Sequence, residues 1–332
     1  MLQVGIRVPS FAWPDLSFAD AQALMDYCRR VEATGFAGIW ALDHLLESPA
    51  LYGVSWLDPL HVMTSAAAVT TSVSIGSAAL VMPLRHPVLL AKELASMQLL
   101  SGGRTILGAA TGWDEAEFNA IGVPLRERGK RTDECLAIVR ALLREESVEY
   151  QGTWFSLDGL TIYPRVPTPL PVWIAGGSLG HAPETPDRPY IAPAVLARIR
   201  EADGWMSRSS GSDADEVQAD WQVVKADLRD HGRDPETLVF GHTQFVHIVE
   251  TSSREDALAE QLPHFARVMG GHRTADHLAA SYLLGTTEEI QARVSDLVAA
   301  GLQYLIATPV SDDPGQLDLI NKYIHQPFNS VA

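Results

Sequence analysis

The chain has 332 residues, of which 46% are hydrophobic and 20% charged, as in ordinary globular proteins. Its 25 Lys and Arg and 41 Asp and Glu give a net charge of −16, which disfavours nucleic acid as a partner. The only two cysteines, Cys28 and Cys135, are too few for a disulfide framework and are expected in the core. The sequence shows neither a signal-peptide pattern nor an apolar run of membrane-spanning length, so a cytoplasmic protein with no membrane partner is predicted.

Short apolar strands alternate with amphipathic helices through the first half of the chain. Strands are predicted at Leu2–Val8, Gly38–Leu42, Val73–Val81 and Thr105–Ala110. The helix starts are predicted at Ser17, Asp58-Pro59 and His86-Pro87, and Gly35 is predicted to end the first helix. A fourth helix is predicted from about Leu125 to Arg144.

A different pattern follows at 148–164, where polar and apolar residues alternate in VEYQGTWFSLDGLTIYP. Its turn signals, Gln151-Gly152 and Asp158-Gly159, predict an external β-hairpin. Further strands are predicted at Pro171–Ala175, Gly204–Met206, Val239–Val249 and Gln303–Thr308. Later helix starts, each three residues before an acidic side chain, are predicted at Ser212, Ser252 and Thr286.

The alternation of strands and helices predicts a parallel sheet that is covered by helices. Closure into a single (β/α)₈ barrel over 1–332 is favoured over an open doubly wound sheet, because no G-x-G-x-x-G follows the first strand. A Pro-rich loop at 178–193 lengthens the connection after the fifth strand. Such a loop is predicted to form a lid, a wall of the substrate site or a subunit contact.

In a barrel of this kind the active site lies at the carboxyl ends of the strands. Polar, small or aromatic residues follow several predicted strands there. They are Asp43-His44, Ala78-Ala79, Thr111-Gly112-Trp113, Ala175-Gly176-Gly177-Ser178 and Arg208. The carboxylate and imidazole of Asp43-His44 can exchange a proton near neutral pH. The Gly-Gly-Ser turn can offer backbone N–H groups to an anion, and the guanidinium of Arg208 suits a phosphate. Ordinary structural roles are the alternative for each of them.

The remaining histidines lack the spacing of a metal site. His242 and His247 fall within the seventh predicted strand, and His272 and His277 follow it without an H-E-x-x-H pattern. These side chains are predicted to face solvent or to be satisfied locally. No metal site is predicted.

Long blocks of the chain resemble the bacterial luciferase-like family of flavin- and deazaflavin-dependent oxidoreductases. The blocks include GFAGIWALDHL, SIGSAALVMPLRHPVLLAKELASMQLLSGGR, GAATGWDEAEFNAIGVPLRERGKRTDE and PLPVWIAGGS, and further matches extend to the C-terminus. The resemblance implies a (β/α)₈ barrel, commonly a homodimer, that holds FMN or coenzyme F420 at the strand ends. It implies a small-molecule substrate but does not identify it.

The resemblance also implies roles for individual residues. His44 is the expected catalytic acid/base with Asp43 beside it, and Ala78 and Ala79 are expected to form a bulge beneath the flavin ring that contains a cis peptide in many members. Further cofactor contacts are expected from Thr111, Gly112, Trp113, Ala175, Gly176, Gly177, Ser178 and Arg208. Lid or substrate contacts are expected from Trp13, Trp56, His181, Arg188 and Tyr190.

Three functions agree with these expectations. The first is a two-component monooxygenase that receives reduced FMN from a separate reductase and oxidises a small organic substrate with O₂. The second is a coenzyme F420-dependent oxidoreductase that transfers a hydride without oxygen. Trp113 stands where the F420-dependent sugar-phosphate dehydrogenases of the family carry a catalytic Glu, so that particular reaction is not expected. The third is a non-catalytic flavin-binding barrel, which the intact Asp43-His44 pair disfavours.

Overall fold

Eight parallel strands close into a ring in the structure. The structure is a computed structural model, and it describes residues 1–12, 17–47, 52–178, 181–182, 185–207 and 212–329. The strands, in ring order, are β1 (Gln3–Arg7), β3 (Gly38–Ala41), β5 (Ser74–Ser77), β7 (Thr105–Ala110), β10 (Val172–Ala175), β13 (Gly204–Ser207), β14 (Val239–Val246) and β15 (Tyr304–Pro309). The pairing of β10 with β7 closes the sheet, and the short β6 (Leu80–Val81) pairs with β7 outside the ring. The predicted (β/α)₈ barrel is confirmed.

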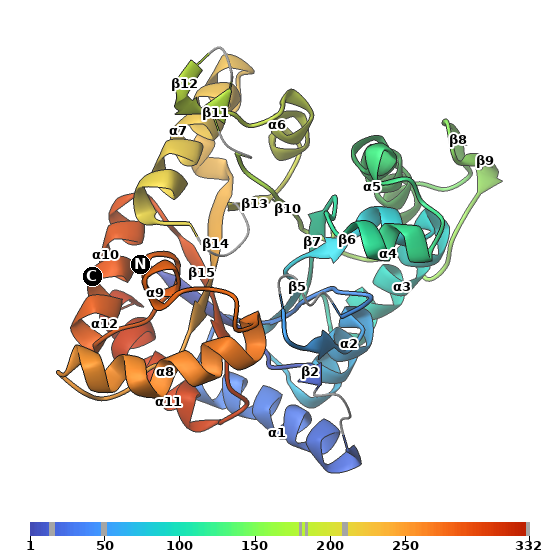
Figure 1. The fold of residues 1–332 in the computed structure, drawn as a ribbon. Helices are drawn as coiled ribbons and strands as arrows, with labels where there is room; N and C mark the ends of the chain where they lie inside the picture. Colours follow the sequence, from blue (N-terminus) through green and yellow to red (C-terminus); the bar gives the residue numbers. More distant parts are fainter. Residues whose placement is uncertain (13–16, 48–51, 179–180, 183–184, 208–211, 330–332) are drawn as a thin grey trace.

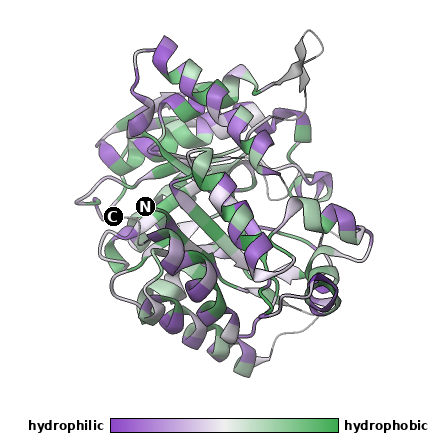
Figure 2. Cartoon of the chain, turned by 90° about the vertical axis from the view of Figure 1, so that its left-hand side faces the viewer, coloured by the Kyte–Doolittle hydropathy of each residue, from purple (hydrophilic) through white to green (hydrophobic). Residues whose placement is uncertain are grey.

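Helices surround the barrel, with their hydrophilic sides outward and apolar strands between them (Figures 1 and 2). They are α1 (Phe18–Thr34), α2 (Pro59–Val69), α3 (Pro87–Leu100), α4 (Glu115–Ala120), α5 (Arg128–Arg144), α6 (Pro193–Arg200), α7 (Ala214–Asp230), α8 (Arg254–Met269), α9 (Ala275–Ser281), α10 (Thr287–Ala299), α11 (Gly315–Ile320) and α12 (Gln326–Asn329). The two ends of the chain meet, because the Leu2 N–H donates to the Phe328 carbonyl at 3.0 Å.

Most of the predicted helix starts are confirmed by their capping hydrogen bonds. Ser17 and Thr286 form complete capping boxes, and Asp58 and His86 cap α2 and α3. The starts of α7 and α8 lie one residue beyond the predicted serines, because Asp213 and Ser253 supply the capping oxygens. Neighbouring Ser and Asp residues can each accept a hydrogen bond from the free N–H groups of the first turn, so the sequence does not determine which of them is the cap.

Large aromatic side chains fill the barrel interior. Trp40, Trp173 and Tyr304 are almost completely buried, and the Trp40 indole N–H donates to the Tyr304 hydroxyl at 3.1 Å. Glycines on neighbouring strands make room for these rings: a Cβ at Gly76 would lie 2.4 Å from the Trp40 ring, and one at Gly5 2.5 Å from it. The interior is therefore a packed core, and open space for ligands has to lie at the ends of the strands.

The third predicted strand, Val73–Val81, is not continuous. It divides into β5 and β6 at a cis peptide bond between Ala78 and Ala79. Directly before the division, the Ser77 hydroxyl donates to the Gly108 carbonyl at 2.9 Å and accepts from the Gly108 N–H at 3.1 Å. The non-proline cis peptide expected from the family resemblance is present.

Three two-stranded antiparallel sheets lie outside the ring, and two of them are hairpins. The predicted external hairpin is formed by β8 (Val148–Gln151) and β9 (Ser156–Leu160), with a turn after Gln151, whereas Gly159 lies within β9 and makes no turn. The predicted loop at 178–193 contains a second hairpin, β11 (His181–Ala182) with β12 (Thr185–Pro189), beside α7 (Figure 1). The third joins β2 (Phe11–Ala12) to β4 (Ser55–Trp56).

Both cysteines are buried and unpaired, as predicted. Among the described helices, none has the length and apolar composition needed to cross a membrane.

Candidate active site

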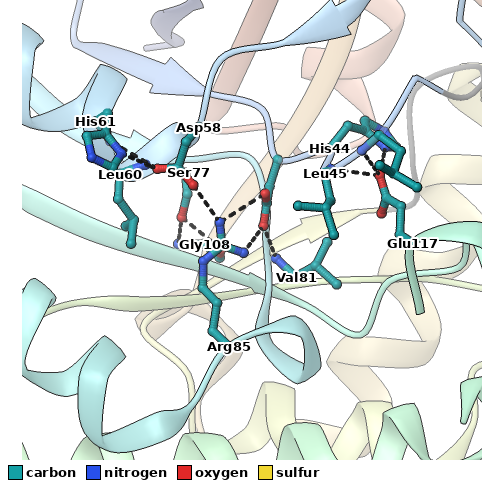
Figure 3. Close-up of polar contacts among 12 residues, drawn as sticks. His44, Leu45, Asp58, Leu60, His61, Ser77, Val81, Arg85, Gly108 and Glu117 are labelled. Carbon is teal, nitrogen blue, oxygen red and sulfur yellow. Dashed lines mark hydrogen bonds and ion pairs between the residues drawn. The ribbon is translucent and has the colours of Figure 1, made fainter. Parts of the chain in front are cut away.

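His44 lies at the mouth of the barrel, meaning the carboxyl ends of the ring strands and the loops that follow them. It comes three residues after β3 and is 8% exposed. Its Nδ1 lies 3.0 Å from Oε1 of Glu117, a side chain on α4 that is 2% exposed (Figure 3). Because an ionised carboxylate can only accept, the proton on the imidazole is held at Nδ1. Nε2 is thereby left to exchange a proton with a ligand.

Glu117 also fixes the loop that carries the imidazole. The same carboxylate oxygen accepts the backbone N–H of Leu45 at 2.8 Å and that of Leu46 at 3.3 Å. Buried N–H groups without a partner are costly, so one carboxylate satisfies the turn and orients the ring at once. This is the arrangement of a general acid or base that is positioned by a third group.

Aromatic rings enclose the imidazole. Tyr52 and Trp113 meet the His44 ring edge to face, with centroids 5.1 and 5.7 Å away. Tyr52 in turn contacts the predicted residue Trp56, with 5.9 Å between ring centroids. Trp113 is half exposed, so its ring forms part of the rim of the mouth.

Asp43 does not point its carboxylate at His44, contrary to the expected acid–base pairing. Its two oxygens form an ion pair with Arg85, at 2.6 and 3.1 Å, and one of them accepts the Val81 N–H at 2.8 Å. Arg85 also reaches Asp58 at 3.2 Å, in a group of contacts separate from that of Glu117 (Figure 3). Burial raises the pKa of Asp43, while Arg85 and the Val81 N–H oppose that shift. Asp43 is therefore a positioning residue that ties β3 to β6 and α2.

Small residues line one side of the mouth. Ala79, Thr111, Gly112 and Ala175 are partly exposed. They lie after β5 and β7 and at the end of β10, three strands that are consecutive in the ring. Gly112 has a φ of 72°, and a Cβ there would lie 2.5 Å from the Val81 side chain. A flat ring can approach the backbone along such a strip, so the residues present fit a flavin or deazaflavin.

The Gly176-Gly177-Ser178 turn offers fewer donors than the sequence implied. The Gly176 N–H donates to the Met206 carbonyl at 3.1 Å, and the Ser178 N–H to the buried Asp220 carboxylate at 2.8 Å. Two of the three N–H groups predicted for an anion are therefore engaged inside the protein. The Gly177 N–H, which donates to none of the described residues, could still bind a phosphate.

Some predicted site residues lie outside the described residues or are described by their backbone alone. Trp13 and Arg208 fall outside the described residues. His181 and Arg188 belong to β11 and β12, where the backbone alone is described, and Tyr190 follows β12 with 48% of its surface exposed.

The histidines of the seventh strand differ from each other. His242 is buried, with Nδ1 2.7 Å from the Ser207 hydroxyl and Nε2 3.0 Å from the Gln244 amide nitrogen, so it is satisfied locally as predicted. His247 is also buried, but its Nδ1 has no partner in the described part of the chain, and its ring stacks on His264 at 4.1 Å. For His247 the prediction of a solvent-facing or locally satisfied ring is wrong, because α8 packs over this end of β14.

Glu117 and Arg7 are the site residues that sequence reasoning missed. Glu117 stands among several acidic residues at the start of α4, where Asp114 as cap and Glu115 in the first turn account for local charge preferences. A weak signal for the burial of Glu117 was its position next to Phe118, a large apolar residue that is itself buried. Arg7, at the end of β1, is a charged residue that follows the apolar run Val4–Ile6.

Comparison with known proteins identifies the family of this barrel. A family model described as luciferase-like monooxygenase matches residues 2–304. The chain belongs to the luciferase-like monooxygenase family. Together with the fold and the His44 site, this makes the protein a luciferase-like oxidoreductase.

The most similar luciferase-like proteins differ in activity. An uncharacterised protein of Mycobacterium tuberculosis is 29% identical over 224 residues, which cover 61% of this chain and 72% of that protein. The F420-dependent glucose-6-phosphate dehydrogenase of Amycolatopsis mediterranei is 32% identical over 46% of this chain and 47% of its own length. The 5,10-methylenetetrahydromethanopterin reductase of Methanolobus tindarius is 24% identical over 90% of this chain and 94% of its own.

Solved structures of the same fold also include more than one activity. The monooxygenase RslO1 from Streptomyces bottropensis superposes with a TM-score of 0.76 at 20% identity, over 98% of this chain and all of the other. An F420-dependent secondary alcohol dehydrogenase in complex with an F420-acetone adduct superposes with a TM-score of 0.78 at 16% identity, over 98% of both chains. At these identities the likeness concerns the fold.

Proposed function

We propose that this protein is a coenzyme F420-dependent oxidoreductase, with His44 as the group that moves the substrate proton. The observation that carries the proposal is the buried His44–Glu117 contact, which engages Nδ1 and leaves Nε2 without a hydrogen bond to the described residues. Curated relatives whose names state F420 dependence support this cofactor, over about half of the chain. The sequence alone placed the FMN-dependent monooxygenase first and the F420-dependent oxidoreductase second, so the proposal reverses the two.

The deazaflavin supplies a hydride acceptor or donor when it is bound. Thr111, Gly112 and Ala175 offer its ring a surface of small residues, and the bulge at Ala78-Ala79 lies on the same side of the mouth. His44 takes a proton from a substrate hydroxyl at Nε2 during oxidation, and the Glu117 carboxylate stabilises the imidazolium that results. Tyr52 and Trp113 keep water from the imidazole.

A second candidate is an FMN-dependent monooxygenase. The family model that matches the chain is described as luciferase-like monooxygenase, which supports this candidate. Trp113 argues against a sugar-phosphate dehydrogenase but does not distinguish the two cofactors. Reduced FMN would then come from a separate reductase. That reductase, the homodimer and the cytoplasmic location remain predictions.

Anaerobic titration of the purified protein with oxidised and reduced FMN and with F420 tests the proposal. Tryptophan fluorescence is the readout, and a Trp113→Phe variant identifies the part of the signal that arises at the mouth. We expect tighter binding of F420 than of FMN, and no oxygen uptake after reduced F420 is added. A preference for reduced FMN, with oxygen uptake on mixing, would overturn the proposal in favour of the monooxygenase. His44→Gln is expected to bind the cofactor within a few-fold of wild type but to slow turnover by about 100-fold or more.

A further inference from the structure

Arg7 is a buried cation without an acidic partner. It lies at the carboxyl end of β1 and is 4% exposed. Its Nη1 donates to the Ala78 carbonyl at 3.0 Å, whereas Nε and Nη2 have no hydrogen-bond partner in the described part of the chain. The charged state of Arg7 is influenced by the hydroxyls of Tyr52 and Tyr282, and no carboxylate of the described residues forms an ion pair with it.

An unpaired buried charge is unfavourable unless something offsets it. Burial lowers the pKa of Arg7 to about 10, so the guanidinium remains protonated at neutral pH. The ring of Phe245 lies 4.9 Å from the guanidinium carbon and offsets a small part of the cost. The planar edge formed by Nε and Nη2 is buried and unpaired among the described residues, and such an edge binds a carboxylate with two parallel hydrogen bonds.

Other polar groups on this side of the mouth are likewise without partners among the described residues. They include the Ser10 hydroxyl, the Trp56 indole N–H and the Thr308 hydroxyl. Thr308 lies on β15, the ring neighbour of β1, and Trp56 pairs with Phe11, which follows β1. Native proteins rarely leave several buried polar atoms unpaired, so their gathering around β1 indicates a polar occupant.

The position of Arg7 separates this occupant from the cofactor. The strip of small residues follows β5, β7 and β10, whereas Arg7 and Thr308 belong to β1 and β15, and β3 with His44 lies between the two groups. The hydrogen bond from Arg7 to Ala78 joins the two sides at the bulge. A group held by Arg7 would therefore lie next to this bulge, on the side of the ring formed by β1 and β15.

We propose that Arg7 binds a carboxylate of the substrate, so that the enzyme acts on organic acids whose apolar part packs against Tyr52, Trp56 and Phe245. The proposal rests on the proposed function in one respect, namely that the Ala78-Ala79 bulge supports the cofactor. It extends that function by naming the chemical class of the substrate.

Calorimetric titration of the cofactor-free protein with benzoate and with its uncharged analogue benzamide tests this. We expect benzoate to bind at least tenfold more tightly than benzamide, because charge-assisted hydrogen bonds to Arg7 are lost with the amide. Arg7→Met is expected to weaken benzoate binding by about tenfold or more, and Arg7→Lys by several-fold, since lysine keeps the charge but not the paired donors. Arg140→Gln is the matched control: it removes one positive charge from α5, where Arg140 pairs with Glu201, and should bind benzoate as wild type does.

The outcomes separate this inference from the proposed function. Equal binding of benzoate and benzamide, or undiminished benzoate binding by Arg7→Met, would overturn the role of Arg7. Loss of benzoate binding on saturation with F420 or FMN would also overturn it, because Arg7 would then belong to the cofactor. Thermal unfolding checks both variants, and Arg7→Lys decides the matter if Arg7→Met does not fold. Benzoate binding through Arg7 in a protein that does not bind F420 would contradict the proposed function and leave the anion site standing, whereas failure to oxidise or reduce any organic acid would overturn the substrate class inferred here.

Discussion

Replacement of Glu117 by Gln separates the charge of this carboxylate from its capacity to accept hydrogen bonds. One oxygen of Glu117 serves three donors, namely the His44 imidazole and the backbone N–H groups of Leu45 and Leu46. Gln has nearly the same shape and keeps an acceptor oxygen, so the loop is expected to retain its position. The change that remains is the loss of a negative charge beside an imidazole that must become cationic during turnover.

The size of the effect follows from the kinds of hydrogen bond involved. A bond to a charged group contributes about 1.5–3 kcal/mol and a neutral one about 0.5–1.5 kcal/mol, so Glu117→Gln should raise the barrier by about 1.5 kcal/mol. That corresponds to a roughly tenfold lower kcat. Glu117→Ala leaves all three donors without an acceptor and opens a cavity in a site that is 2% exposed. Its free energy of unfolding should fall by about 4 kcal/mol, against about 1 kcal/mol for Gln.

Three measurements test this reasoning. Steady-state kinetics give kcat, urea denaturation gives the free energy of unfolding, and nitrogen NMR of the His44 ring shows which nitrogen carries the proton. The wild-type ring is expected to be protonated at Nδ1 above neutral pH, and Glu117→Ala is expected to lose that preference. Glu115→Gln is the matched control, because Glu115 is exposed on the same helix and should change none of the three. A Glu117→Ala protein with wild-type stability and an unchanged His44 tautomer would refute the reasoning.

Two further predictions concern stability. Asp43→Asn should lower the free energy of unfolding by about 3 kcal/mol, because it breaks a buried ion pair with Arg85. Asp58→Asn keeps a capping oxygen and should lower it by about 1 kcal/mol or less. Equal losses of stability in urea denaturation would contradict the role given to Asp43. Burial, with His264 second, lowers the pKa of His247 from 6.5 to about 4, so below pH 6.5 the unfolded chain takes up a proton that the native ring does not. The free energy of unfolding should therefore fall by about 3 kcal/mol in total as the pH drops from about 6.5 to about 4. His247→Phe should flatten this dependence of stability on pH, whereas the control His277→Phe, at an exposed position, should retain it. Identical slopes in the two variants would show that His247 does not titrate as described.

The outline of the barrel could be predicted from local patterns. Helix starts at Ser17, Asp58 and Thr286 are visible in the sequence because a capping hydrogen bond joins residues only two or three positions apart. Strand positions follow from short apolar runs, and their alternation with helices determines a parallel sheet. The interruption of the third strand entered the prediction through the family resemblance, since an unbroken apolar run gives no local sign of it.

The partners of the site residues were decided by the tertiary structure. Asp43 and His44 are neighbours in the chain, yet their side chains diverge to Arg85 and to Glu117, which lies 73 residues from His44. In the same way, the lack of an acidic partner for Arg7 becomes visible once the strands next to β1 are known. The sequence by itself determined which elements form and which strand ends carry polar groups, because those depend on contacts within a few residues. Which charges meet at the mouth depends on contacts between distant parts of the chain, and those contacts exist only in the closed barrel, where β1 lies beside β15 and the loops after the strands converge.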